Sequence, residues 1–76
     1  MTKKQLRNKL KVYRAMEDWT QEELARRVNV TRKTINTIEN SKYVPSTYLA
    51  LKMAAAFGVT VEELFQLDDE EVPDQP

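Results

Sequence analysis

Apolar residues recur along this chain every three or four positions, which is the spacing of amphipathic helices. The pattern predicts five helices, over about residues 4–17, 20–28, 31–40, 46–57 and 60–67. By their period, the following residues are expected in the core: Tyr13, Met16, Leu24, Ala25, Val28, Val30, Ile35, Ile38, Ala50, Ala54, Phe57, Val59 and Leu64. No segment alternates over enough residues to require a strand. The expected fold class is therefore all-α.

Hydroxyl residues mark the starts of four of these helices, where a side-chain oxygen can accept a hydrogen bond from a free backbone amide. They are Thr20, Thr31, Ser46 and Thr60. "TQEE" at residues 20–23 and "TVEE" at residues 60–63 also match the capping box, in which the Glu bonds back to the first amide. Thr2, with Gln5 three residues later, is a weaker version for the first helix.

The connection between the predicted second and third helices is unusually short, at about three residues. Asn29 stands where a left-handed residue would end the second helix, and Asn tolerates that conformation. Val30 is positioned to pack inward just before the Thr31 cap. Two short helices joined this tightly form a helix-turn-helix, whose second helix directs its N-terminal residues toward the DNA major groove.

Composition limits the chemistry that the chain can perform. It has 76 residues, enough for one domain, with 41% hydrophobic residues and neither cysteine nor histidine. Disulfides, thiolate zinc sites and histidine bases are thereby excluded. With no nucleophile–base set, glycine-rich phosphate loop or metal cluster in the sequence, we expect no enzyme activity and no cofactor.

Charge is unevenly distributed although the net charge is zero. Residues 1–44 carry eleven Lys or Arg against five acids, a net charge of +6, and residues 45–76 carry one against seven, a net charge of −6. The basic residues 1–44 would attract the phosphate backbone of a nucleic acid. The alternative is that these charges are ordinary solvated groups on helix surfaces. Residues 68–76 form an acidic tail after a domain at 1–67, and their acids lack the spacing and glycine of a calcium loop.

The N-terminal stretch "MTKKQLRNKLKVYR" is charged, so no signal peptide is expected, and no apolar run is long enough to cross a bilayer. The expectation is a soluble, cytoplasmic protein without a membrane partner.

From about residue 8 to residue 67 the chain resembles the phage-repressor and Cro-like (XRE-type) helix-turn-helix transcriptional regulators, in a small single-domain form. "TQEELA", "TINTIEN" and "FGVTVEELF" carry the resemblance together. It implies a compact five-helix, lambda-repressor-like domain whose second and third helices form the helix-turn-helix. It also implies a homodimer that binds double-stranded DNA at a palindromic operator, most simply as a repressor.

Residue roles follow from the same resemblance, position by position. The base-contacting positions are Arg32, Lys33, Asn36 and Thr37. The phosphate-contacting positions are Thr20, Gln21, Thr34, Asn40, Lys42 and Tyr43. Gln21 is expected either to contact phosphate or to support the third helix. Asn29 and Ser41 stand where the family often has glycine, and Ser41 could change the loop after the third helix.

Two further expectations concern contacts within and between chains. Glu39 is expected to pair with a basic residue, either Arg14 or Arg26. The dimer interface is expected at Phe65, Leu67, Tyr48 and Leu49, joined by Val72. The alternative for Phe65 and Leu67 is that they complete the core of one chain.

A second reading places the chain in another functional class. It would be an antitoxin-like or adaptor module that also binds DNA and holds a protein partner through its acidic C-terminal region. The two functions can coexist.

Overall fold

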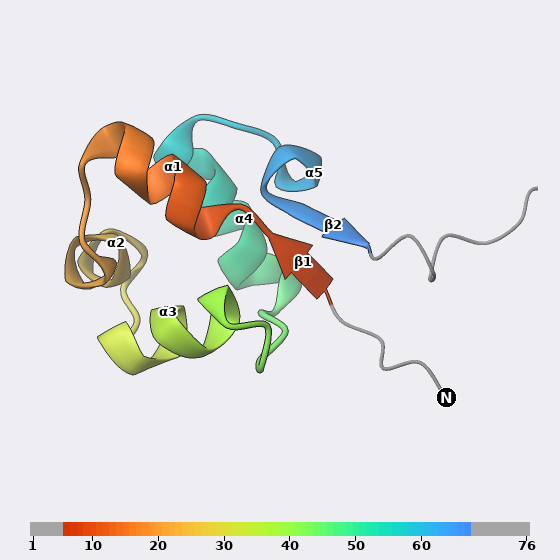
Figure 1. Cartoon of the computed structure of the whole chain (residues 1–76), viewed down its shortest axis with the longest axis horizontal. Coiled ribbons are helices and arrows are strands. Elements are labelled where there is room, and N and C mark those ends of the chain that lie inside the picture. The colour runs from red at the N-terminus through yellow and green to blue at the C-terminus, as the bar shows by residue number, and fades with distance from the viewer. Residues whose placement is uncertain (1–5, 68–76) are drawn as a thin grey trace, which may run out of the picture.

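The computed structural model describes residues 6–67, which form five helices and two short strands around one core (Figure 1). The elements are β1 (Leu6–Asn8), α1 (Leu10–Glu17), α2 (Gln21–Val28), α3 (Arg32–Glu39), α4 (Thr47–Phe57), α5 (Val61–Leu64) and β2 (Phe65–Leu67). The expected five-helix fold is confirmed, with the two strands as an addition. In the described part of the chain, no helix is both long and apolar enough to cross a membrane.

Hydroxyl side chains cap α2, α3, α4 and α5 as the sequence predicts. In each case the side-chain oxygen of the capping residue accepts from the backbone amide three residues later. The full capping box forms only at α5, where Glu63 Oε1 accepts from the Thr60 amide at 2.8 Å. At α2 the expected box is incomplete, because the Glu23 carboxylate pairs instead with Arg26 at 2.6 Å.

The two ends of the described chain pair as an antiparallel ribbon, with Leu6 opposite Leu67 and Asn8 opposite Phe65. The prediction of helix from residue 4 to residue 17 and from residue 60 to residue 67 was therefore wrong over these strands. Each strand is too short to show an alternating pattern, and its partner lies at the far end of the sequence.

The side chain of Asn8, the last residue of β1, contacts the start of α1, while the expected cap at Thr2 lies outside the described residues. Its Oδ1 accepts from the Leu10 amide at 3.1 Å, and its Nδ2 donates to the Ile38 carbonyl at 3.0 Å. The Lys9 amide donates to the Leu64 carbonyl at 2.9 Å and continues the ribbon to the start of α1. The start of α1 is thus tied to both α3 and α5.

One hydrophobic core joins all five helices and β2. Its buried members are Leu10, Leu24, Ala25, Val28, Ile35, Ile38, Leu49, Ala50, Met53, Ala54, Leu64 and Phe65. Most of the predicted core is confirmed, and Met16 is the exception because its side chain is exposed. In a helix of 3.6 residues per turn, Met16 lies about 120° around α1 from the buried Leu10.

Aromatic side chains close one end of this core. The Phe57 ring packs against Tyr13 at 5.7 Å and stacks on Trp19 at 5.1 Å between centroids. The Arg27 guanidinium covers the other side of Trp19, 4.1 Å from the ring centroid. Trp19 is thus a half-buried wedge between α1 and α2, as expected for that position.

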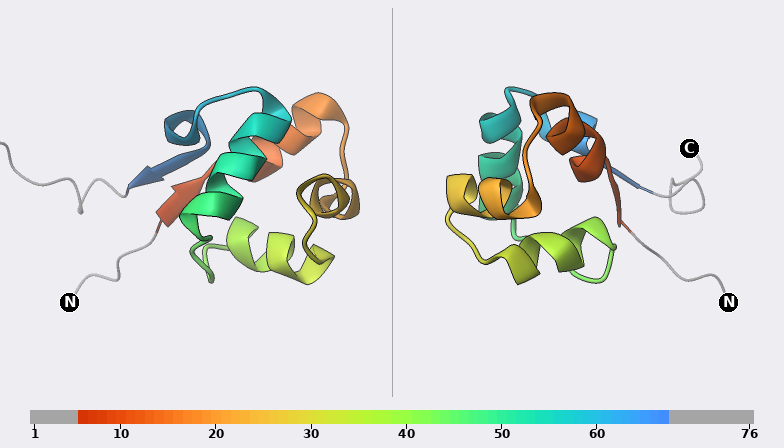
Figure 2. Two further views of the ribbon diagram at one scale, coloured as in Figure 1. Left: turned by 180° about the vertical axis from the view of Figure 1, so that it is seen from behind. Right: turned by 60° about the vertical axis from the view of Figure 1, so that its left-hand side comes forward.

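α3 lies along an outer edge of the molecule (Figures 1 and 2). α1 lies on the opposite side, and the ribbon extends from a third side next to the end of α3. This arrangement leaves one long face of α3 without a covering element among residues 6–67.

Candidate nucleic-acid interface

The turn between α2 and α3 has the predicted construction. Asn29 ends α2 in the left-handed conformation, with φ 61° and ψ 48°. The next amide, that of Val30, donates to the Ala25 carbonyl at 2.9 Å, and the Val30 side chain packs against the core. Thr31 then caps α3. These contacts fix α3 relative to α2 and complete a helix-turn-helix.

α3 has one buried apolar face and one polar face. Ile35 and Ile38 are fully buried and hold the helix against the core. Arg32, Lys33 and Asn36 are exposed, and none of them contributes to the core. The helix can therefore present polar side chains outward while its packing stays fixed.

Two open clefts lie along the polar face, and Lys33 borders both. The first, of about 350 Å³, is lined by Arg32, Lys33 and Asn36. The second, of about 310 Å³, is lined by Lys33, Thr34, Thr37, Lys42 and Tyr43. We call these residues together the α3 surface. All four predicted base-contacting residues belong to it, with three of the six predicted phosphate-contacting residues.

Hydroxyl groups on the α3 surface are engaged within the helix. The Thr37 hydroxyl is 2.9 Å from the Thr34 carbonyl and 3.1 Å from the Lys33 carbonyl, so its hydrogen is donated internally. Thr34 shares a hydrogen bond with Thr31, whose hydroxyl oxygen lies 3.0 Å away. The Thr37 methyl group and the two lone pairs of its hydroxyl oxygen are the groups left for an outside partner.

The loop after α3 is held by Ser41, which adopts a left-handed conformation with φ 60°. Its amide donates to the Ile38 carbonyl at 3.0 Å, and its hydroxyl donates to the Leu6 carbonyl of β1 at 3.2 Å. Serine thus replaces the common glycine without loss of the turn. Lys42 and Tyr43, which follow it, are both exposed.

The remaining predicted phosphate-contacting residues lie at helix ends. Thr20 and Asn40 are exposed, at the start of α2 and the end of α3. Gln21, in the first turn of α2, donates its Nε2 to Glu39 Oε1 at 3.0 Å and to Asn36 Oδ1 at 3.2 Å. Of the two roles expected for Gln21, support of α3 is therefore the one visible in these contacts.

A buried ion pair lies behind the α3 surface. Arg14 Nε lies 2.6 Å from Glu39 Oε2, and Nη2 donates to Oε1 at 3.1 Å. The side chain of Glu39 is 1% exposed and that of Arg14 is 15% exposed. Of the two partners left open by the sequence, Arg14 is the one that pairs. The sequence did not predict the Gln21–Asn36 contact, because it joins two helices and follows no local spacing rule.

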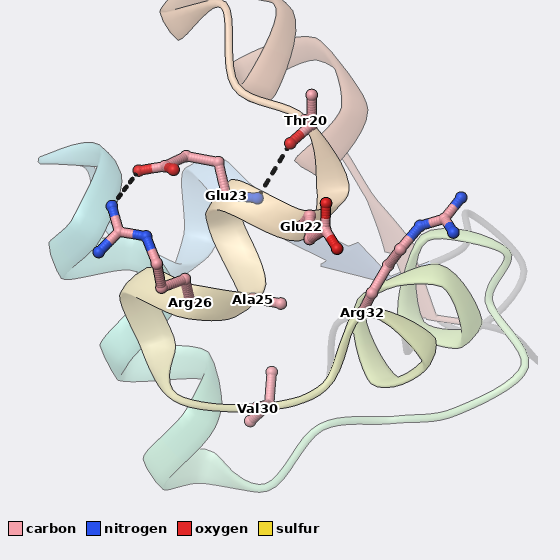
Figure 3. Close-up of a pocket in the computed structure, with 7 residues that line it drawn as sticks. All are labelled: Thr20, Glu22, Glu23, Ala25, Arg26, Val30 and Arg32. Atoms are coloured by element: carbon pink, nitrogen blue, oxygen red, sulfur yellow. Dashed lines mark hydrogen bonds and ion pairs between the residues drawn. The ribbon is translucent and has the colours of Figure 1, made fainter.

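Figure 3 shows a third cleft, of about 520 Å³, beside the turn. Ala25 and Val30 lie between the helices, while the Arg32 side chain extends away from them. Glu23 accepts from Arg26 here, and this hydrogen bond and the charges of Arg26 and Arg27 hold the pKa of the Glu23 carboxyl below its ordinary value. Most residues that line the cleft cap α2, pair along it or pack at the turn, and Arg32 also belongs to the α3 surface. Among residues 6–67, no cluster of acidic residues could hold a metal ion.

The predicted interface residues divide into two groups. Leu49 and Phe65 are buried in the core of the single chain, which for Phe65 is the alternative that the sequence left open, and Val72 lies outside the described residues. Tyr48 and Leu67 are exposed, together with Leu51, which the sequence analysis missed. An apolar cleft of about 450 Å³ lies between the ribbon, α5 and the start of α4, and Leu51 and Leu67 help to line it. We call it the ribbon cleft.

A family model described as "Helix-turn-helix" matches residues 10–64, which span α1 to α5. The chain belongs to the XRE-type helix-turn-helix family. Curated relatives agree with this assignment. An uncharacterized HTH-type transcriptional regulator of Methanocaldococcus jannaschii is 50% identical over 66 residues, which cover 87% of this chain and 100% of that one. YgzD of Bacillus subtilis, also named as an uncharacterized HTH-type transcriptional regulator, is 45% identical over 65 residues, covering 86% and 98%.

Solved structures share the fold of this helix-turn-helix protein. The hypothetical transcription factor NHTF from Neisseria matches with a TM-score of 0.68 and 31% identity. The match covers 71% of this chain and 61% of the Neisseria chain, so the chain spans less than two thirds of that protein. The family resemblance drawn from "TQEELA", "TINTIEN" and "FGVTVEELF" is confirmed.

Proposed function

We propose that this helix-turn-helix regulator is a cytoplasmic, sequence-specific repressor that binds a palindromic operator in double-stranded DNA as a homodimer. Repression would follow because an occupied operator excludes RNA polymerase. The observation that carries the proposal is the two-faced α3, with Ile35 and Ile38 fully buried and the α3 surface open. A helix held in this way can enter the major groove without rearrangement.

The chemistry of the α3 surface supports base contacts. The Arg32 guanidinium can donate two hydrogen bonds to guanine O6 and N7, and Lys33 can donate to the same atoms. Thr37 has its methyl group available for the methyl group of thymine. The exposed Lys42 and Tyr43 border the same surface, where they would meet phosphates.

The ribbon cleft supports the homodimer. The exposed Tyr48, Leu51 and Leu67 provide apolar surface that a second copy of the chain would cover. The ribbon lies beside α3 rather than behind it, so a two-fold axis on this side can place both copies of α3 on one face of DNA (Figure 1). The paired helices would then enter successive major grooves, about 34 Å apart. A protein contact through the acidic C-terminal region falls on residues 68–76, outside the described residues.

Selection of bound sequences from a random duplex pool tests this function. We expect a palindrome whose half-sites lie about one helical turn apart. On the selected sequence, Arg32→Ala should lower affinity by about 5- to 150-fold, the range for a bidentate base contact, with a smaller effect on random DNA. Lys33→Ala should be selective in the same direction.

Lys11→Ala is the matched control, because it removes an equal charge from an exposed position on α1, opposite α3. It should leave the preference for the selected sequence unchanged. Equal losses on selected and random DNA for Arg32→Ala would limit this side chain to phosphate contact. A pool without an enriched sequence would refute specific binding.

A further inference from the structure

We propose that the buried Arg14–Glu39 pair, acting through Gln21, fixes the orientation of the Asn36 amide so that it contacts bases only as a hydrogen-bond donor. Asn36 would then favour a base whose major-groove edge presents hydrogen-bond acceptors, so guanine would be preferred over adenine. This inference rests on the proposed function, because it assumes that the α3 surface enters the major groove. Gln21 is a positioning residue in this scheme, and Asn36 makes the contact.

The first step fixes Gln21. The Glu39 carboxylate is held by two hydrogen bonds from Arg14, at 2.6 and 3.1 Å, and its oxygens can only accept. The Gln21 atom that lies 3.0 Å from Glu39 Oε1 must therefore be the amide nitrogen. Chemistry alone thus determines which way the Gln21 amide faces.

The second step fixes the orientation of the Asn36 side-chain amide. The same Gln21 nitrogen lies 3.2 Å from the Asn36 side chain, and an amide nitrogen can only donate. The facing atom of Asn36 must therefore be its oxygen. Asn40 Nδ2 donates to this oxygen as well, at 3.3 Å. Both lone pairs of Asn36 Oδ1 are thus used within the protein.

The third step concerns the bases. An asparagine pairs with adenine by accepting from N6 and donating to N7, which requires a free side-chain oxygen. Asn36 has its oxygen engaged, and its amide nitrogen remains to donate from an exposed position. Guanine presents two acceptors, O6 and N7, in the major groove. Arg32 and Lys33 also only donate, so neighbouring positions on the α3 surface share the same preference.

The experiment uses the full chain and the duplex obtained from the random pool. Each base pair of one half-site is changed in turn, and the position facing Asn36 is identified as the one whose preference disappears in Asn36→Ala. In the natural protein we expect guanine to bind about tenfold better than adenine at this position, within the range for one discriminating contact. Replacement of that guanine by 7-deazaguanine, which lacks the N7 acceptor, should weaken binding.

Gln21→Ala is the decisive variant. It removes the shorter of the two hydrogen bonds to the Asn36 oxygen and leaves only the one from the exposed Asn40. Asn36 can then turn and pair with adenine, and the guanine-to-adenine ratio should fall toward one. Because this ratio is measured within one protein sample, it does not depend on how much of the variant is folded. Lys11→Ala is the control, because Lys11 is an exposed residue of α1 that lines neither the α3 surface nor the ribbon cleft.

The outcomes separate this inference from the proposed function. A preference for adenine opposite Asn36, or an unchanged ratio in Gln21→Ala, would overturn the inference while specific binding through Arg32 persisted. Absence of any sequence preference in the natural protein would overturn the proposed function as well. A ratio that falls in Gln21→Ala and stays unchanged in Lys11→Ala supports the inference.

Discussion

Glu39 is the residue on which the contacts behind the α3 surface converge. It accepts from Arg14 of α1 and from Gln21 of α2 while it ends α3, so three helices meet at one carboxylate. Arg14 also donates to the Trp19 carbonyl at 2.9 Å, which extends the network into the α1–α2 connection. Removal of either charge would leave the other without its partner in a largely dry site.

Glu39→Gln should therefore lower the free energy of unfolding by about 3 kcal/mol, because the Arg14 charge remains buried and uncompensated. Urea denaturation followed by Trp19 fluorescence measures this change. The charge-free control is the double variant Arg14→Met/Glu39→Leu, which should lose less stability than Glu39→Gln. A double variant as unstable as the sum of its two single substitutions would show that charge burial is not the cause.

The sequence defined some residues of the site and left others open. Asn29 was predicted in its left-handed conformation because the constraint is local to the turn. The partner of Glu39 stayed open between two arginines, because the choice depends on how α1 packs across α3. Leu49 and Phe65 were assigned to a surface, but both are buried. Hydrophobicity alone does not show which side of a helix end or of a strand faces the core.

At the scale of elements, capping controls where α4 begins. Ser46 Oγ accepts from the Leu49 amide at 3.1 Å, and the helix follows from Thr47. Ser46→Ala should reduce the free energy of unfolding by about 1 kcal/mol, because an amide at the helix start loses its partner.

Thr47→Ala is the neighbouring control for this prediction. Thr47 lies inside the helix, where alanine has the higher helix propensity, so stability should stay the same or rise slightly. Denaturation of both variants in parallel compares them directly. A loss of stability in Thr47→Ala equal to that in Ser46→Ala would show that the cap is not what stabilises this end.

Element boundaries were predictable where their signals are local. The structure places α2, α3 and α4 within one residue of the predicted ranges, since each begins after its own hydroxyl cap. β1 and β2 were missed for the opposite reason. Three residues carry too little pattern, and each strand forms only because the other is present.

At the scale of the whole molecule, the basic excess and the ribbon cleft define two separate surfaces. Arg32, Lys33 and Lys42 gather at the α3 surface, while the ribbon cleft contains mainly apolar side chains. Of the seven acids after residue 44, only Glu62 and Glu63 lie among the described residues. The separation of basic and acidic charge expected from the sequence therefore lies only partly within residues 6–67.

Leu51→Glu should convert the proposed homodimer to a monomer, because it places a charge in the apolar ribbon cleft. Sedimentation equilibrium measures the mass, and binding to a full palindrome should weaken more than binding to a single half-site. Val12→Glu is the matched control, since Val12 on α1 is 54% exposed and Leu51 is 55% exposed. A natural chain that sediments as a monomer on its own would contradict the dimer.

The antiparallel ribbon also determines how the molecule responds to force. Leu6 and Leu67 form the outermost pair, so tension applied at the two ends of the described chain acts on the same end of the ribbon. Under such tension the ribbon opens one residue pair at a time, as a zipper does, instead of sliding all its hydrogen bonds at once. The domain would therefore yield first at β1 and β2, while the helix-turn-helix stayed folded behind them.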